Sequence, residues 1–180
     1  ARICGEELPD LKVIRTKATE GLALPAADSS AVPFSPGSEH DALLIYTSGT
    51  TGRPKGVIHS HASLLAGGAN TAAAHHLTPE DRALCVLPLC HINGQVVTVM
   101  GPLLSGSSVV MPSRFRVSMF WDWVSVHRCT WFSAVPTIIS YLLGAQEAGS
   151  NPEKNILAHV RFGRSASAAL PPAVHTAFVE

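Results

Sequence analysis

The residues best suited to chemistry are concentrated in one short segment, Y-T-S-G-T-T-G-R-P-K-G, at positions 46–56. Its donors are four hydroxyl side chains, two glycines and a lysine, namely Thr47, Ser48, Gly49, Thr50, Thr51, Gly52 and Lys55. Glycine lets the backbone turn and expose its N–H groups, hydroxyls add donors, and lysine adds a point charge. Polyphosphate oxygens require this combination of groups. The segment is therefore predicted to be a phosphate-binding loop rather than a surface turn that binds nothing.

A Walker A loop, G-x-x-x-x-G-K-[ST], is the obvious alternative, and it does not fit the spacing. Five residues after Gly49 stands Pro54 instead of glycine, and Lys55 is followed by Gly56 instead of serine or threonine. A Walker loop also opens directly into a helix that holds phosphate at its N-terminus. Here Pro54 and the β-branched pair at 57–58 favour a strand. We therefore expect loop amides, hydroxyls and Lys55 to hold phosphate, with little help from a helix dipole.

The loop must be positioned by the elements around it, and these alternate between strands and helices. An apolar run at 42–46, interpreted as a buried strand, precedes the loop, and extended chain resumes at 57–58. Further strands are predicted at 11–15, 84–87, 108–111, 131–135 and 160–162. Helices are predicted at 60–76, 96–100, 117–124, from 136 and from 171, with a short helical start at 78–81. Apolar strands alternating with helices indicate an α/β fold, a doubly wound parallel sheet with helices on both faces.

Composition excludes several classes of protein. An apolar fraction of 46% excludes a disordered chain, and thirteen basic residues balance thirteen acidic ones, so no field attracts nucleic acid. Charged residues make up only 14% of the chain, against about 25% in an average soluble domain. We therefore expect that further chain normally covers part of this surface, and that the 180 residues are a fragment.

The sequence gives little indication of a metal site, a disulfide framework or a membrane span. The four cysteines include no C-x-x-C pair, and His59, His61, Cys90 and His91 lack the partner ligands of a metal site. Residues 83–113 carry no charge, yet proline, glycine and polar residues divide them into pieces shorter than the ~18 apolar residues of a membrane crossing. No membrane span is therefore expected. Reduced thiols and the absence of a signal peptide favour the cytoplasm.

The loop resembles, at every position, the phosphate-loop signature of the adenylate-forming (AMP-binding) superfamily, which includes acyl-CoA synthetases, luciferase and peptide-synthetase adenylation domains. Residues 87–94, L-P-L-C-H-I-N-G, resemble the family's P-L-F-H-x-x-G block, with Cys90 where an aromatic residue is commoner. Residues 164–170, R-S-A-S-A-A-L, resemble its S-G-A-A-P-L segment, with Ala166 for glycine and Ala169 for proline. The resemblance implies that residues 41–180 are part of the AMP-binding subdomain of a large N-terminal domain. Residues 1–40 would then be the end of a preceding βα segment and an Ala/Pro/Ser-rich linker.

The resemblance also implies a reaction in two halves. ATP first activates a carboxylic acid to an acyl-adenylate, and the thiol of coenzyme A then displaces AMP. Lys55 and His91 are the implied catalytic residues, with His91 near the carboxylate. The implied nucleotide-binding residues are the loop positions Thr47, Ser48, Gly49, Thr50, Thr51, Gly52 and Lys55, together with Ser165, Ala166 and Ser167 beside the adenine. Thr47 is the position linked with Mg²⁺.

Other functions in the family remain open at this point. Peptide-synthetase domains usually carry an aspartate for the substrate's α-amine in the block after the loop, and residues 90–94 offer no carboxylate. An acid without an α-ammonium group is therefore expected. The thiol acceptor is coenzyme A or, alternatively, a carrier protein, and a non-catalytic nucleotide-binding module is a further alternative. Because the family's later catalytic groups lie beyond these residues, the 180-residue chain alone is expected to be inactive.

Overall fold

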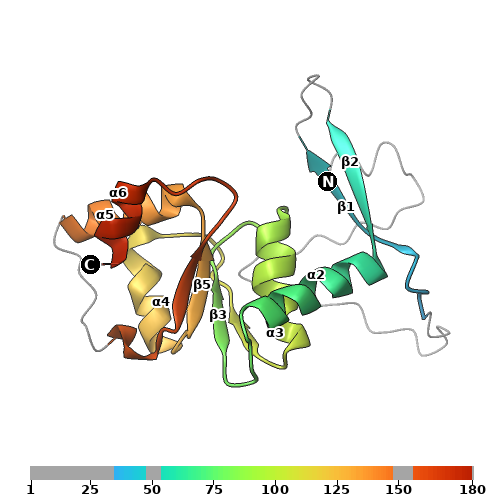
Figure 1. Cartoon of the computed structure of the whole chain (residues 1–180), viewed down its shortest axis with the longest axis horizontal. Coiled ribbons are helices and arrows are strands. Elements are labelled where there is room, and N and C mark those ends of the chain that lie inside the picture. Colours follow the sequence, from blue (N-terminus) through green and yellow to red (C-terminus); the bar gives the residue numbers. More distant parts are fainter. Residues whose placement is uncertain (1–34, 48–53, 148–155, 180) are drawn as a thin grey trace. The chain divides into compact units, whose positions relative to one another are not determined.

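A parallel sheet and a separate antiparallel hairpin make up the β-structure of the computed structural model (Figure 1). The structure describes residues 35–47, 54–147 and 156–179. The chain divides into two units, Ala1–Ser35 and Pro36–Glu180, and the elements below belong to the second. The strand predicted at 11–15 lies outside the described residues.

The strands on either side of the predicted phosphate loop form the hairpin. Strands β1 (Asp41–Thr47) and β2 (Lys55–Ser60) pair antiparallel, with Thr47 opposite Lys55. The predicted strands are confirmed, but the interpretation of 42–46 as a buried strand is wrong: Leu44 is 50% exposed and Tyr46 is 67% exposed. The physical reason is that this two-stranded sheet stands apart from the parallel sheet, so helices do not cover both of its faces.

The parallel sheet has the strand order β4-β3-β5-β6. Its strands are β3 (Arg82–Cys85), β4 (Ser108–Val110), β5 (Trp131–Ala134) and β6 (Phe162–Ser165). All three neighbouring pairs are parallel, and β5 pairs with β6 through Trp131 opposite Phe162 and Ser133 opposite Arg164. The predicted α/β class with a parallel sheet is confirmed, although β6 begins two residues later than the strand predicted at 160–162.

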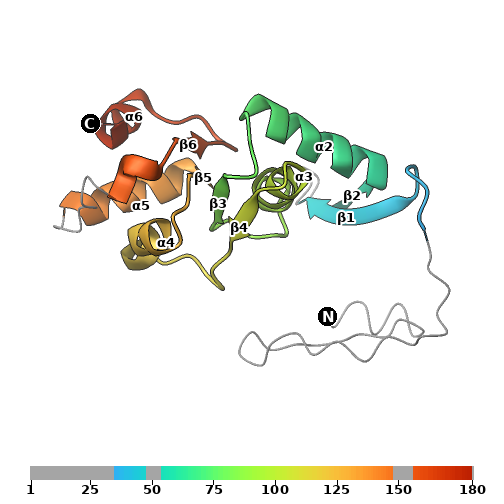
Figure 2. The ribbon, with the colours of Figure 1, turned by 90° about the horizontal axis from the view of Figure 1, so that it is seen from below.

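Helices cover both faces of this sheet (Figures 1 and 2). One face carries α4 (Phe120–Val126), α5 (Pro136–Glu147) and α6 (Pro172–Val179). The other carries α2 (His61–Ala74), the π-helix η1 (Asn93–Met100) and α3 (Gly101–Leu104). Short 3₁₀ helices stand at η2 (Val117–Met119) and η3 (Ile156–His159). The doubly wound arrangement is confirmed.

Consecutive side chains of β5 show how the two faces are built. Phe132 packs edge-on against Phe120 and Phe178, which belong to α4 and α6. Trp131 contacts the ring of His75, directly after α2. Because successive strand residues point to opposite faces, one strand serves both cores. Ser60 caps α2 by accepting a hydrogen bond from the Ser63 amide at 3.2 Å, which accounts for the start of the predicted helix.

The helical start predicted at 78–81 is wrong. Thr78 and Asp81 form a turn in which the Asp81 amide donates to the Thr78 carbonyl and the Asp81 carboxylate accepts from the Thr78 amide. The chain then enters β3 directly. The reason is tertiary: Thr130 and Arg161, both distant in sequence, donate to the same carboxylate and hold the turn against the sheet. Among the described residues, no helix has the length and apolar character to cross a membrane.

Candidate functional site

A pocket of about 870 Å³ lies where the hairpin meets the segments that follow β3, β5 and β6. Ligands of open α/β sheets collect at the carboxyl ends of the strands, and this pocket has that position. Its walls are formed by Ile45, Tyr46, Thr47, Val57, His59, Leu87, Pro88, His91, Ile92, Asn93, Val135, Ile138 and Ser167. All three sequence blocks singled out above therefore contribute a residue to one pocket.

The hairpin brings together the two ends of the predicted phosphate loop. Thr47 is the last residue of β1 and Lys55 the first of β2, and the Thr47 hydroxyl donates to the Lys55 carbonyl at 3.3 Å. Thr47 lines the pocket. The predicted phosphate-binding residues Ser48, Gly49, Thr50, Thr51 and Gly52 lie outside the described residues, and their role stays a prediction. The register of the hairpin thus determines where the loop leaves and rejoins the sheet.

A tight turn after β3 presents His91. The His91 amide donates to the Pro88 carbonyl at 3.1 Å, and the His91 carbonyl accepts from the Gln95 amide at 3.0 Å. Gly94 is required here, because a Cβ at this position would lie 2.6 Å from the Pro88 carbonyl oxygen. The turn leaves the His91 side chain exposed at the pocket wall, and its predicted role beside the carboxylate stays a prediction.

The segment predicted to lie beside the adenine continues from β6. Ser165 ends the strand, and the Ala166 amide donates to the Ala134 carbonyl of β5 at 3.1 Å. Ser167 has a left-handed backbone with φ of +73°, which is uncommon for a non-glycine residue and marks a local constraint. Only Ser167 of the three lines the pocket.

Three residues that are absent from the predicted site form a polar cluster that is hydrogen-bonded to Ser167. The Asn93 side-chain oxygen accepts from Arg164 Nη1 at 2.8 Å and from the Ser133 hydroxyl at 3.0 Å. Arg164 Nη1 also donates to the Ser133 hydroxyl oxygen at 3.1 Å, and Asn93 Nδ2 donates to the Ser167 hydroxyl at 3.3 Å. Asn93 and Ser133 are buried, and burial lowers the pKa of the Arg164 guanidinium. The sequence signal for this cluster was Ser133, a hydroxyl inside the apolar run of residues 131–135.

The described part of the site offers hydroxyl groups that can form hydrogen bonds to a ligand. The Thr47 hydroxyl at the loop end, the Ser167 hydroxyl in the pocket wall and the buried Ser165 Oγ, which has no partner among the described residues, are hydrogen-bonding groups beside or near the pocket. The described residues contain no group of three or more His, Cys, Asp or Glu side chains that could hold a metal. Thr47 alone is too little to establish a Mg²⁺ site, so that role stays a prediction.

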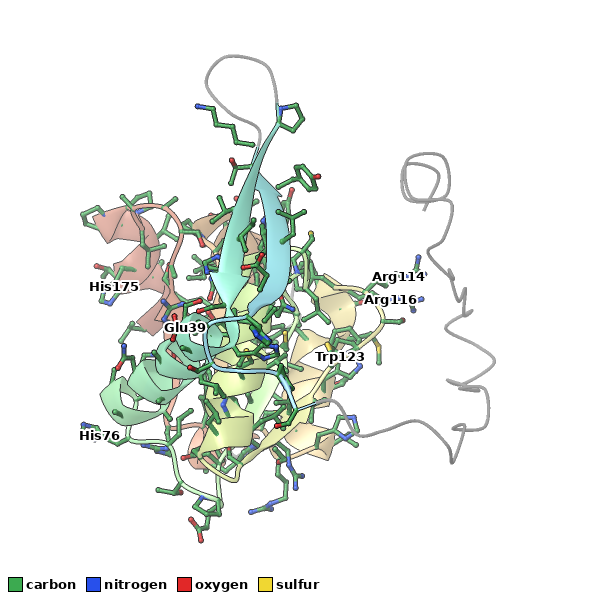
Figure 3. The ribbon with its side chains drawn as sticks, turned by 90° about the vertical axis from the view of Figure 1, so that its right-hand side faces the viewer. Glu39, His76, Arg114, Arg116, Trp123 and His175 are labelled. Atoms are coloured by element: carbon green, nitrogen blue, oxygen red, sulfur yellow. The ribbon has the colours of Figure 1, made fainter. Side chains whose placement is uncertain are left out.

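The apolar helix predicted at 96–100 forms part of η1 and packs in the core. Val96 is buried, and the buried Thr98 hydroxyl donates to the Asn93 carbonyl at 2.8 Å. These residues do not line the pocket. Two exposed arginines, Arg114 and Arg116, project from the chain between β4 and η2 and are also absent from the pocket walls (Figure 3).

Comparisons with known proteins agree with the sequence blocks. Residues 5–180 match the model of the AMP-binding enzyme family. The chain is 53% identical over 157 residues to a sulfoacetate–CoA ligase of Cupriavidus necator, an alignment covering 87% of this chain and 30% of the relative. It is 39% identical over 132 residues to an oxalate–CoA ligase of Saccharomyces cerevisiae, covering 73% of this chain and 23% of the relative.

Solved structures of a ligase and of MatB are also similar to this chain. A malonyl-CoA ligase with methylmalonyl-CoA and AMP bound aligns with a TM-score of 0.73 at 34% identity, over 83% of this chain and 32% of that one. ATP-bound MatB from Rhodopseudomonas palustris aligns with a TM-score of 0.67 at 30% identity, over 81% of this chain and 28% of that one. The chain therefore spans less than a third of the length of these relatives.

Proposed function

Because the chain belongs to the AMP-binding enzyme family, we propose that the whole protein activates a carboxylic acid with ATP and transfers the acyl group to coenzyme A. The observation that carries this proposal is the meeting of Thr47, His91 and Ser167 in one pocket. These residues come from the phosphate loop, the histidine block and the adenine-side segment, which are separated in sequence. A turn that binds nothing would not require them to share a pocket.

Each group has a defined task in the proposed first half-reaction. A carboxylate oxygen attacks the α-phosphorus of ATP, and the bond to the leaving pyrophosphate breaks. Lys55, the loop amides and the hydroxyls stabilise the charge that accumulates on pyrophosphate, and bound Mg²⁺ would add positive charge there. His91 orients the attacking carboxylate, and residues 165–167 lie along the adenine. In the second half-reaction the thiolate of coenzyme A attacks the acyl carbon and AMP leaves.

The proposed acid is small and carries a second anionic group. Three relatives are named for acids of this kind, namely sulfoacetate, oxalate, and malonate or methylmalonate, whereas another is named for acetate. The segment 90–94, which contributes His91, Ile92 and Asn93 to the pocket, contains no carboxylate to pair with an α-ammonium group. Free amino acids are therefore disfavoured, and a dianionic acid is the class to test first.

The test is acid-dependent exchange between pyrophosphate and ATP, followed by product analysis. The full-length protein is incubated with ATP, Mg²⁺ and each of sulfoacetate, malonate, oxalate, propanoate and glycine. We expect exchange with at least one dianionic acid, and formation of its coenzyme A thioester with one AMP per thioester. ATP binding without exchange for any acid would favour a non-catalytic nucleotide-binding module. Exchange without thioester formation until a carrier protein is added would favour the carrier-protein acceptor.

A further inference from the structure

Arg164 is a cation without a matching anion. Its Nη1 atom donates to the neutral oxygens of Asn93 and Ser133, and no carboxylate of the described residues forms an ion pair with it. The side chain is half-buried. Charges withdrawn from water are normally paired with an opposite charge. Arg164 does not itself line the pocket, so its charge acts on a bound ligand through Asn93, which does.

The orientation of the Asn93 side chain follows from its neighbours. Arg164 can only donate, so the Asn93 atom that it contacts at 2.8 Å must be the carbonyl oxygen. The amide nitrogen is therefore the atom directed to the Ser167 hydroxyl at 3.3 Å. That nitrogen carries two hydrogens, and Ser167 uses one. Asn93, which is 8% exposed and lines the pocket, thus has a further N–H donor backed by the Arg164 charge.

Asn93 and His91 line the same pocket but differ in burial. His91 is exposed, whereas Asn93 lies two residues farther along and is buried. Leu87, Val135 and Ile138 supply apolar wall to the same pocket. Because His91 and Asn93 line the same pocket, we place the reacting carboxylate at His91 and the other end of the acid toward Asn93. A group that ends there meets an N–H donor and a positive potential.

We propose that Asn93, backed by Arg164, is the specificity-determining site for a second anionic group, a carboxylate or sulfonate, at the far end of the acid substrate. This inference rests on the proposed acid–CoA ligase function. Asn93 contacts the substrate anion directly. Arg164 acts as a positioning residue, because it holds the Asn93 oxygen and supplies the charge that makes the amide N–H a stronger donor.

The test compares two acids that differ only in the charge at the far end. Sulfoacetate and methylsulfonylacetate share a shape, as do malonate and malonamate, and in each pair only the first has a second negative charge. In the full-length protein, Asn93→Asp replaces the amide with a carboxylate of nearly the same size. We expect a loss of roughly 10²-fold in kcat/KM for the dianionic acids, carried mainly by KM, and a change within about threefold for the neutral-ended acids and for ATP.

Variants of Arg164 provide a second, independent test of the proposal. Arg164→Met should weaken use of the dianionic acids by roughly tenfold or more, and Arg164→Lys should restore part of that loss because it retains the charge. Arg116→Met removes an exposed arginine outside the pocket and serves as the matched control. Thermal unfolding of each variant identifies loss of folding. Should Asn93→Asp fail to fold, the Met and Lys pair at position 164 still decides the question.

Each outcome has a distinct meaning. Equal losses for dianionic and neutral-ended acids would overturn the proposal and leave the cluster a purely structural role. A loss confined to the KM of ATP would also overturn it and assign the cluster to the nucleotide through Ser167. If the wild-type protein shows no exchange with any acid, the proposed ligase function fails. Calorimetric titration with sulfoacetate and malonate then still shows whether wild type binds dianions and Asn93→Asp does not.

Discussion

Lys55 stands opposite Thr47 at the base of the predicted phosphate loop, so its backbone position is set by the hairpin. It is the one cation of the loop segment besides Arg53. In the full-length protein we expect Lys55→Ala to slow acid-dependent pyrophosphate exchange by roughly 10²-fold, because the leaving pyrophosphate loses an electrostatic stabiliser. The apparent affinity for the acid should change much less.

The matched control for Lys55 is Arg53→Ala. It removes a positive charge from the same loop at a position that the resemblance leaves free. Exchange in the control should stay near the wild-type rate. A Lys55→Ala protein that exchanges within about twofold of wild type would show that the phosphate-loop assignment is wrong.

The turn after β3 places His91 in the pocket wall, at the carboxyl end of the parallel sheet. We expect His91→Ala to reduce kcat/KM for the acid by roughly 10-fold or more while leaving ATP binding nearly unchanged, because the family resemblance assigns the residue to the carboxylate rather than to the phosphates. Steady-state kinetics with each substrate varied, together with equilibrium binding of ATP, separates the two effects. Loss of ATP affinity alone would contradict this placement.

At the scale of the element, Gly94 is the second residue of η1 and follows the turn that presents His91. A Cβ there would come within 2.6 Å of the Pro88 carbonyl oxygen and 3.0 Å of the Leu87 carbonyl oxygen, and neither backbone atom can move without shifting the turn. We expect Gly94→Ala to displace His91 and lower exchange activity by roughly 10-fold or more. It should also lower the free energy of unfolding by about 2 kcal/mol through overpacking.

Gly144 in α5 provides the control for Gly94. A Cβ at Gly144 meets no atom within 4 Å. Alanine is a better helix former than glycine, so Gly144→Ala should leave exchange unchanged and raise the free energy of unfolding by about 0.5–1 kcal/mol. Urea denaturation monitored by tryptophan fluorescence measures both variants. If both glycines tolerated alanine equally well, the tight turn would not be what positions His91.

At the scale of the whole unit, Asp81 ties distant elements together at the amino end of the sheet. Its carboxylate accepts from Arg161, from the Thr130 hydroxyl at 2.7 Å and from the Thr78 amide at 2.9 Å. Arg161 in turn donates to the carbonyls of His75 and His76 after α2. Burial alone would raise the pKa of Asp81, but these hydrogen bonds and the Arg161 charge together lower it.

The sign of the pKa shift predicts how stability depends on pH. Because the folded state lowers the pKa of Asp81 below its usual 3.8, the carboxylate stabilises the fold above that value and the contribution is lost as the pH falls through the folded-state pKa. We expect Asp81→Asn to lower the free energy of unfolding by about 2 kcal/mol at neutral pH and to flatten its decline in acid. Asp122→Asn, at an exposed carboxylate of α4, is the control. Parallel acid declines in wild type and Asp81→Asn would contradict the assignment.

The chain of 180 residues, tested alone, should not complete either half-reaction. It spans less than a third of its relatives, so we expect further groups of the proposed active site to lie outside these residues. A site with part of its preorganised donors loses most of its rate enhancement. A hydroxamate assay with the same acids tests this, and turnover close to that of the full-length protein would show that the essential groups all lie within residues 1–180.

The sequence by itself determined the features that depend on local pattern. Apolar strands alternating with amphipathic helices indicated a parallel sheet covered on both faces, as observed, whereas the phosphate site indicated by the donor density of residues 46–56 stays a prediction. Only the tertiary structure decided that residues 42–46 belong to an exposed hairpin and that residues 78–81 form a turn held by Arg161. It alone revealed the Asn93–Ser133–Arg164 cluster, whose members lie 40 and 71 residues from Asn93. Periodicity reports which face of an element is apolar, but contacts over such separations depend on strand order and register, which no local spacing encodes.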